Sequence, residues 1–308
     1  MNNLTNKLYI DTEQDALYQE LIEQLNLQDL TITDDPESAN ILLASPPRIS
    51  TKLEQYSCVE WVQSIYAGVD ALSTLDKTPK FTLTNVKGIF GQQIAEYVLG
   101  YAISHFRHFD QYKEQQVNGL WHQIPYQTID TKSMLILGTG SIGNHVAQMA
   151  KALGMTVYGV NRSGIPPKDS NFDETYHIQE LRQTLSQVDI VVSTLPNTKE
   201  TNGLLNRETL EQCNGVLVFN VGRGPTINEE GLLAAVDGGS VTHAYLDVFN
   251  HEPLDRQHAF WNHPSITVTP HIAAISVPEQ VVEIFQQNYR NWHSGFKLEN
   301  VVDLSKGY

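Results

Sequence analysis

Apolar and polar positions alternate with two different periods along residues 1–98. The segment 15–25 has helical spacing, with an apolar face that includes Leu17, Leu21 and Leu25. Short apolar runs predict β-strands at 8–10, 30–33, 41–44, 61–66 and 81–86. Strands that alternate with helices are typical of an α/β domain with a parallel sheet.

A second α/β series follows a long helical segment, 92–116, which we expect to cross a domain junction because it exceeds the average helix length. Its strands are predicted at 133–138, 156–160, 189–194, 215–220, 242–249 and 266–270. The final helix, 278–295, begins no further domain, so we expect it to pack against the first one. The sequence therefore predicts an α/β fold with two doubly wound parallel-sheet domains and a cleft between them. One domain is discontinuous, 1–98 plus 276–308, and the other is 99–275.

The composition is that of an ordinary globular protein, because 41% of the 308 residues are hydrophobic and 18% are charged. No stretch contains the ~20 apolar residues that a bilayer-spanning helix needs. The two cysteines, Cys58 and Cys213, lack motif spacing and have apolar neighbours. We expect two buried free thiols rather than a disulfide, and a cytoplasmic location.

The formal net charge is −15, from 35 acidic against 20 basic residues. Nucleic-acid binding needs clustered Lys and Arg, so we expect no nucleic-acid partner. An anionic membrane surface is disfavoured by the same charge balance. A small anion can still bind where a few cations and backbone N–H groups converge.

The clearest chemical signal is GTGSIG at 138–143, between a predicted strand and a predicted helix. Gly138 permits a tight turn, Gly140 lets a pyrophosphate approach the backbone, and Gly143 lets helix and strand pack closely. The helix start, with Ser141 and Ile142, then offers N–H groups to the phosphates. The pattern predicts dinucleotide binding. The alternatives are a turn that binds nothing and an S-adenosylmethionine site.

The second strand of this unit ends without the acid that usually holds the ribose hydroxyls of NAD. Asn161, Arg162 and Ser163 occupy its end instead. NADP carries an additional phosphate there, which an Asp would repel. Asn161 and Ser163 can hydrogen-bond to it, and Arg162 offers charged donors; the alternative is a surface arginine. We therefore expect NADP(H) to be preferred over NAD(H).

Further motifs follow in order: YAGVD (66–70), TNVKGIFGQQIAEYVLG (84–100), STLPNTKET (193–201), FNVGRGP (219–225), YLDVFNHEPL (245–254) and TPHIAA (269–274). Together with GTGSIG they give nearly the whole chain a resemblance to the D-isomer-specific 2-hydroxyacid dehydrogenases, most closely to members that reduce glyoxylate or hydroxypyruvate. The resemblance implies that 99–275 is a Rossmann NAD(P)-binding domain inserted in a flavodoxin-like substrate-binding domain. It also implies a homodimer.

The family's catalytic positions map onto Arg223, Glu252 and His271, each at the end of a predicted strand. The resemblance implies reduction of a small 2-keto acid to a D-2-hydroxy acid. Histidine has the pKa that suits proton donation near neutrality. Glu252 would favour the charged imidazole, and Arg223 can bind a carboxylate while its flanking glycines leave room for substrate. Each residue alone would more often be structural or solvated, but the three together favour catalysis. We expect no metal.

The resemblance also suggests binding residues. A small-residue turn would hold the substrate carboxylate through its N–H groups, or is an ordinary turn: Ala67, Gly68 and Val69. Asp247 corresponds to the residue that holds the nicotinamide amide. The loop beside the ribose corresponds to Thr194, Leu195 and Pro196. Segment 44–47 lacks the bulky aromatic residue of related sequences, which leaves the pocket size open.

Other functions stay open. The same fold can oxidise another small anion such as phosphite, whereas formate dehydrogenases of the superfamily pair the histidine with glutamine, so Glu252 counts against formate. A non-catalytic, dinucleotide-sensing scaffold similar to the C-terminal-binding corepressors would keep the same fold and similar catalytic residues. A methyltransferase could use the glycine turn, but the Arg, Glu and His set disfavours it.

Overall fold

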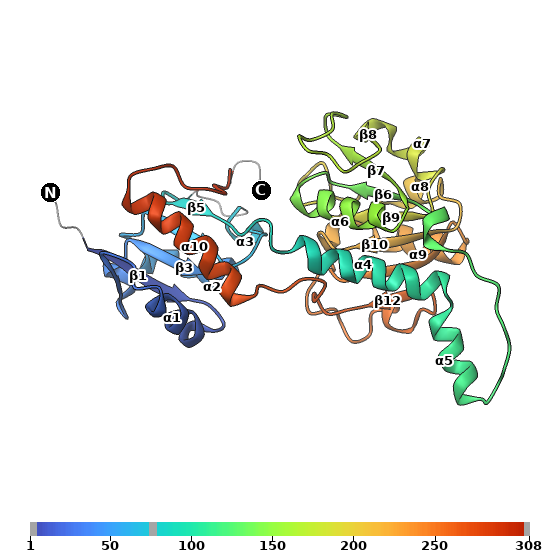
Figure 1. The fold of residues 1–308 in the computed structure, drawn as a ribbon, viewed down its shortest axis with the longest axis horizontal. Coiled ribbons are helices and arrows are strands. Elements are labelled where there is room, and N and C mark those ends of the chain that lie inside the picture. The colour runs from blue at the N-terminus through green and yellow to red at the C-terminus, as the bar shows by residue number, and fades with distance from the viewer. Residues whose placement is uncertain (1–4, 74–78, 305–308) are drawn as a thin grey trace. The chain divides into compact units, whose positions relative to one another are not determined.

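Two compact units make up the computed structural model, which describes residues 5–73 and 79–304 (Figure 1). Unit 1 is Met1–Ile89 with Ser276–Tyr308, and unit 2 is Phe90–Ile275. The predicted boundary at 98/99 instead falls inside a helix, α4 (Gly91–Phe106), that belongs entirely to unit 2. The predicted cleft between the domains stays a prediction.

Unit 1 contains a five-stranded parallel sheet with strand order β2-β1-β3-β4-β5. Its strands are β1 (Asn6–Asp11), β2 (Leu30–Ile32), β3 (Ile41–Ala44), β4 (Trp61–Ser64) and β5 (Thr82–Thr84). Its α-helices are α1 (Asp15–Gln24), α2 (Pro46–Ile49), α3 (Asp70–Ser73) and α10 (Pro278–His293). This order is that of a flavodoxin-like, doubly wound sheet, which confirms the predicted fold class.

The last helix, α10, lies in unit 1 because its apolar side completes the core there. The Phe285 ring stacks on Trp61 of β4 with the centroids 5.3 Å apart, and both side chains are fully buried. Aromatic stacking of this kind adds to the free energy of burial. The chain therefore crosses between the units twice.

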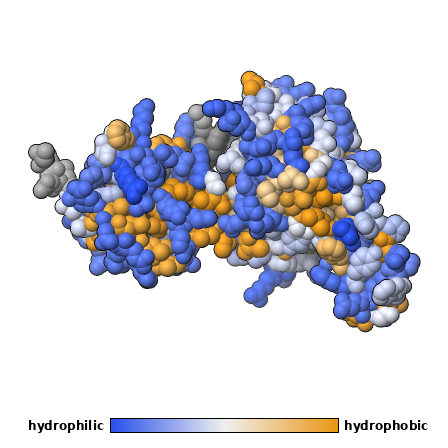
Figure 2. Space-filling view, in the orientation of Figure 1, coloured by the Kyte–Doolittle hydropathy of each residue, from blue (hydrophilic) through white to orange (hydrophobic). Residues whose placement is uncertain are grey.

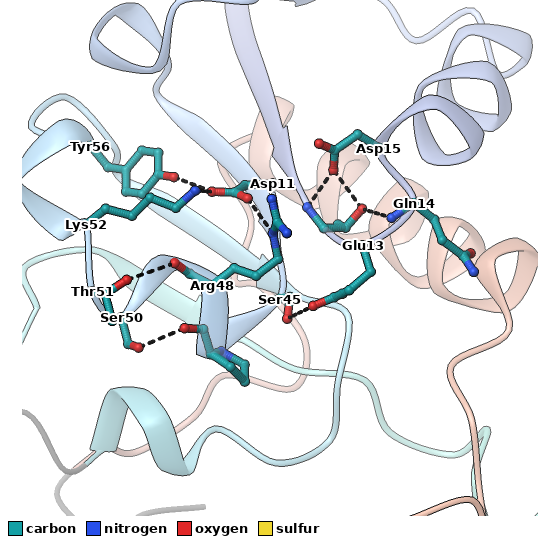
Figure 3. A network of polar contacts seen from close by, with 12 residues as sticks. Asp11, Glu13, Gln14, Asp15, Ser45, Arg48, Ser50, Thr51, Lys52 and Tyr56 are labelled. Carbon is teal, nitrogen blue, oxygen red and sulfur yellow. Dashed lines mark hydrogen bonds and ion pairs between the residues drawn. The ribbon is translucent and has the colours of Figure 1, made fainter. Parts of the chain in front are cut away.

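A polar network joins the carboxyl end of β1 to α2 and the turn beyond it (Figure 3). The buried Asp11 carboxylate accepts hydrogen bonds from the Tyr56 hydroxyl (2.5 Å) and the Arg48 Nε (2.8 Å), and pairs with the Lys52 Nζ (2.5 Å). Burial alone would raise the pKa of Asp11, but these three partners together lower it. The network fixes the carboxyl end of β1 in the unit 1 sheet, beside the segment 44–47.

Unit 2 contains a seven-stranded parallel sheet with strand order β12-β11-β10-β9-β6-β7-β8. Its strands are β6 (Ser133–Leu137), β7 (Thr156–Asn161), β8 (Glu174–His177), β9 (Ile190–Ser193), β10 (Val216–Asn220), β11 (Val241–Leu246) and β12 (Ile266–Val268). Its α-helices are α4, α5 (Phe109–Val117), α6 (Ser141–Ala152), α7 (Leu181–Leu185), α8 (Arg207–Leu210) and α9 (Glu229–Asp237). The reversal of strand order at β6 and β9 is that of a Rossmann sheet.

Three local predictions were wrong. The helix expected over 92–116 is two helices, because His108 adopts a left-handed conformation (φ 57°) between α4 and α5. Strand β8 was not predicted, since it is an edge strand with few apolar residues. Both cysteines are free thiols, but Cys58 is exposed and only Cys213 is buried.

Within residues 5–73 and 79–304, no helix has the length and apolar character to cross a membrane.

Candidate active site

The three predicted catalytic residues follow three adjacent strands of unit 2. Arg223 follows β10, Glu252 follows β11 and His271 follows β12. Because parallel strands present their carboxyl ends at one edge, the three side chains lie at the same edge of the sheet. Ligands of open α/β sheets bind at this edge.

Glu252 and His271 form a hydrogen-bonded pair, with 2.7 Å between the Glu252 Oε2 and the His271 Nδ1. The other oxygen of Glu252 accepts the backbone N–H of Phe249 at 2.9 Å. An ionised carboxylate can only accept, so the His271 Nδ1 carries the hydrogen and Nε2 stays outside this hydrogen bond. The His271 side chain is 50% exposed and that of Glu252 35%.

The pair sets the charge of both groups. The hydrogen bond that His271 donates to Glu252 raises the pKa of His271, whereas burial lowers it. Burial raises the pKa of Glu252, but the bonds from His271 and Phe249 outweigh it, so the net shift is downward. The site therefore favours an imidazolium beside a carboxylate, which is the state that donates a proton.

Arg223 lies on a turn that Asn220 organises. The buried Asn220 side chain donates to the Arg223 carbonyl (3.0 Å) and accepts the N–H of Gly222 (3.3 Å). The sequence analysis predicted that the flanking glycines, Gly222 and Gly224, leave room for substrate. That prediction was wrong, because backbone atoms fill the space beside both glycines. A Cβ on Gly222 would lie 2.5 Å from the carbonyl oxygen of Leu195, and one on Gly224 would lie 1.9 Å from the carbonyl carbon of Phe249. Both glycines instead permit close packing of backbones beneath Arg223.

His271 has a strained backbone, because its φ of 54° lies in the left-handed region. Its N–H points to the carbonyls of Asp247 (2.9 Å) and Thr269 (3.0 Å). Such conformations cost free energy and persist only where neighbouring contacts enforce them. Asp247, predicted to hold the nicotinamide amide, is buried beside this loop, and that role stays a prediction.

The glycine turn between β6 and α6 fits a pyrophosphate. Gly138 has a φ of 99°, and a Cβ on Gly143 would lie 2.0 Å from the Gly138 carbonyl oxygen. The Cβ position of Gly140 has no neighbour within 4 Å among the described residues, so a ligand can approach the backbone. The start of α6, with Ser141 and Ile142, carries no side-chain cap, which leaves its N–H groups for an anion.

The predicted ribose loop lies against this turn. The Thr194 hydroxyl is within hydrogen-bond distance of the carbonyls of Leu137 (3.0 Å) and Gly138 (3.2 Å). Leu195 approaches the Cβ position of Gly138 at 3.3 Å, and Pro196 is partly buried beside it. The structure thus brings the two predicted cofactor segments together.

Asn161 has a different role from the one predicted. Its amide nitrogen donates to the Thr139 hydroxyl (2.9 Å) and the Ile165 carbonyl (2.8 Å), so both hydrogens are used. Its oxygen accepts the N–H groups of Ser163 (3.0 Å) and Gly164 (2.7 Å). Asn161 therefore shapes the loop instead of donating to a phosphate.

Arg162, the residue after Asn161, has an exposed side chain that offers charged donors to a ligand.

The predicted substrate turn, Ala67, Gly68 and Val69, lies after β4 in unit 1. Asn85 holds it by donating to the Ala67 carbonyl at 2.6 Å. Sequence analysis missed Asn85 and Asn220, because buried asparagines at strand ends have no distinguishing pattern.

Comparison with known proteins identifies the family. Residues 99–273 match the NAD-binding domain of the D-isomer specific 2-hydroxyacid dehydrogenases. Glyoxylate/hydroxypyruvate reductase A of Salmonella heidelberg is 33% identical over an alignment of 257 residues, which covers 80% of this chain and 81% of that protein.

Solved structures agree. A D-isomer specific 2-hydroxyacid dehydrogenase family protein from Aeromonas salmonicida has 39% identity and a TM-score of 0.92, over 97% of this chain and 99% of the other. A D-isomer specific 2-hydroxyacid dehydrogenase from Xanthobacter autotrophicus, solved with NADPH and MES, has 28% identity and a TM-score of 0.88, over 99% and 100% of the chains. The chain belongs to the D-isomer specific 2-hydroxyacid dehydrogenases, a family of oxidoreductases that bind NAD or NADP.

Proposed function

We propose that this enzyme reduces a small 2-keto acid of the glyoxylate or hydroxypyruvate kind to the D-2-hydroxy acid, with NADPH. The observation that carries the proposal is the 2.7 Å hydrogen bond between Glu252 and His271. It provides a proton donor at the carboxyl edge of the sheet where the Arg223 turn also ends. The Salmonella relative, named as a glyoxylate/hydroxypyruvate reductase, supports the substrate class.

The tasks are then divided among the site residues. When bound, the reduced nicotinamide supplies the hydride to the keto carbon. Arg223 binds the substrate carboxylate with its planar fork and polarises the keto oxygen. The N–H groups of the Ala67–Val69 turn can bind a carboxylate. His271 gives the proton on Nε2 to the oxygen as negative charge develops there, while Glu252 holds the ring and stabilises its charged form. Asp247 holds the nicotinamide amide.

NADPH preference rests on the loop after β7. The end of this strand, at 161–163, holds no acid to pair with the ribose diol, and Arg162 offers a guanidinium that can bind a phosphate. Asn161, bonded at both its oxygen and its nitrogen, gives the loop a fixed shape. The Xanthobacter relative was solved with NADPH, which supports the same choice.

A homodimer is the proposed assembly. The α5 helix and the segment after it expose large apolar side chains, with Val117 86%, Leu120 61% and Trp121 97% exposed. Figure 2 shows hydrophobic residues among hydrophilic ones where Figure 1 places α5. A partner of the same sequence would cover such groups.

The free thiols of Cys58 and Cys213 support the proposed cytoplasmic location.

Turnover of a substrate panel tests the proposal. The purified protein is mixed with NADPH and glyoxylate, hydroxypyruvate or larger 2-keto acids, and loss of NADPH absorbance and product chirality are measured. We expect turnover of the small 2-keto acids and a D product where the product is chiral. Phosphite oxidation with NADP in place of this activity would contradict the substrate class. Tight NADPH binding without any turnover would favour a dinucleotide-sensing scaffold.

A further inference from the structure

The carboxylate of Asp247 anchors the loop that carries His271. One oxygen accepts the Thr269 hydroxyl at 2.6 Å and the N–H of Ile272 at 2.8 Å. The other accepts the N–H of Ala273 at 2.9 Å. Asp247 is only 2% exposed. These donors come from both sides of His271, so one buried side chain holds the whole strained turn.

The hydrogen bonds behind this anchor have a fixed direction. Tyr97, on α4, has its hydroxyl 2.8 Å from that of Thr269. Thr269 has one hydroxyl hydrogen, which it gives to Asp247, because a carboxylate can only accept. Tyr97 must therefore donate to Thr269. Burial raises the pKa of Tyr97 well above its usual range, so this hydroxyl keeps its proton.

A second contact ties the far end of the same loop to α4. The Gln93 side chain donates to the Ile275 carbonyl (3.0 Å) and accepts the Ile275 N–H (2.9 Å). Tyr97 lies one helical turn after Gln93, so α4 holds the His271 loop at two places. Neither Tyr97 nor Thr269 has a role in the chemistry described above.

We propose that Tyr97 and Thr269 are positioning residues for proton transfer. The chain of hydrogen bonds from Tyr97 through Thr269 to Asp247 holds His271 in its strained conformation, with its ring on Glu252. This inference rests on the proposed function, because it assigns these residues to the proton-donating step. A directed chain that ends on the buried Asp247 carboxylate suits such a task, since losing one donor leaves an acceptor unsatisfied and loosens the loop.

The chain offers a matched control in Tyr101, one turn further along α4. Its ring packs against Tyr97 (4.9 Å between centroids) and Tyr245 (4.7 Å), and its hydroxyl has no hydrogen-bond partner among the described residues. Tyr97→Phe and Tyr101→Phe each delete one hydroxyl from neighbouring, partly buried rings. Only the first breaks the chain to Asp247.

The first measurement is the pKa of His271, by NMR titration of ring-labelled histidine assigned through His271→Ala. The charged groups that face His271 are Glu252, Arg223 and Asp247, and both Tyr variants leave all three in place. We expect Tyr97→Phe to lower the pKa of His271, because the ring moves away from Glu252, and Tyr101→Phe to leave it unchanged. Equal titration curves for the two variants would overturn the proposal. This readout needs no turnover, so it decides the proposal even if keto-acid reduction fails.

The second measurement is steady-state kinetics. Tyr97→Phe removes one hydrogen bond, so we expect kcat to fall about 3- to 10-fold. The KM for NADPH should stay nearly unchanged. Thr269→Val should lose more, while Thr269→Ser, which keeps the hydroxyl, should restore most of the rate. The double variant Tyr97→Phe with Thr269→Val should be no slower than Thr269→Val alone, because both act through one chain. Equal losses in Tyr97→Phe and Tyr101→Phe, or additive losses in the double variant, would overturn the proposal.

Discussion

Removal of the Arg162 guanidinium should separate the two nicotinamide cofactors. Arg162 lies on the loop after β7, where the additional phosphate of NADP is expected, and its side chain is exposed. NAD has only a ribose hydroxyl at this place. Arg162→Ala should therefore weaken NADPH binding much more than NADH binding.

The size of the effect follows from the surroundings of Arg162. A hydrogen bond to a charged group contributes about 1.5 to 3 kcal/mol, which is roughly 10- to 150-fold in affinity. Glu200 lies near enough to Arg162 for their charges to interact. Hydrogen bonds from the Glu200 backbone and the Thr198 hydroxyl lower the pKa of Glu200, and the charge of Arg162 lowers it further. A competing carboxylate and exposure to water both reduce the gain. We therefore expect a loss near the lower limit, about 10-fold for NADPH and less than 2-fold for NADH.

Fluorescence titration of each reduced cofactor into the unmodified and variant proteins gives the four dissociation constants. Arg182→Ala is the matched control, because Arg182 is also an exposed arginine of unit 2. Arg182 pairs with Glu208 (2.7 Å) and does not belong to the loop after β7. The control should bind both cofactors normally. Equal losses for NADPH and NADH in Arg162→Ala, or no preference in the unmodified protein, would refute the reasoning.

The catalytic assignments give three further predictions. His271→Ala should lower kcat by about a hundred- to ten-thousand-fold with little change in NADPH affinity, measured by turnover and fluorescence titration, and near-normal turnover would remove His271 from the mechanism. Arg223→Ala should raise KM for the keto acid and lower kcat, because the carboxylate and the keto oxygen both lose a partner; unchanged kinetics would contradict its role. Glu252→Gln should move the alkaline fall in reduction rate to lower pH, because Glu252 raises the pKa of His271 in the unmodified protein. A pH profile that stays in place would show that the pairing does not control the proton.

The fold was largely predictable because its strands are short apolar runs buried in parallel sheets. β9 and β10, for example, are buried at every position, which makes them visible in the sequence. β8 lacks this signal because none of its four residues is buried. The break at His108 has no glycine or proline to mark it, so periodicity alone predicted one helix.

The candidate site was predictable only where a motif carries its chemistry. The glycine turn shows why Gly143 is required, since its Cβ would meet the Gly138 carbonyl. The roles of Asn161 and Tyr97 depend on partners distant in sequence or on loop geometry, so residue type alone gave the wrong role for one and none for the other. The prediction for the glycines around Arg223 was wrong, because the backbones that they contact belong to the loops after β9 and β11.

The pH dependence of the unmodified enzyme in both directions tests most directly the claim that His271 moves the proton. Reduction needs the imidazolium, and oxidation of the D-hydroxy acid needs the neutral ring. Glu252 raises the pKa of His271, so reduction should stay fast through neutrality and fall only as pH rises above the usual histidine pKa. Oxidation should rise through the same pH range. Rates that do not change across this range, or that change in the same direction for both reactions, would contradict the account.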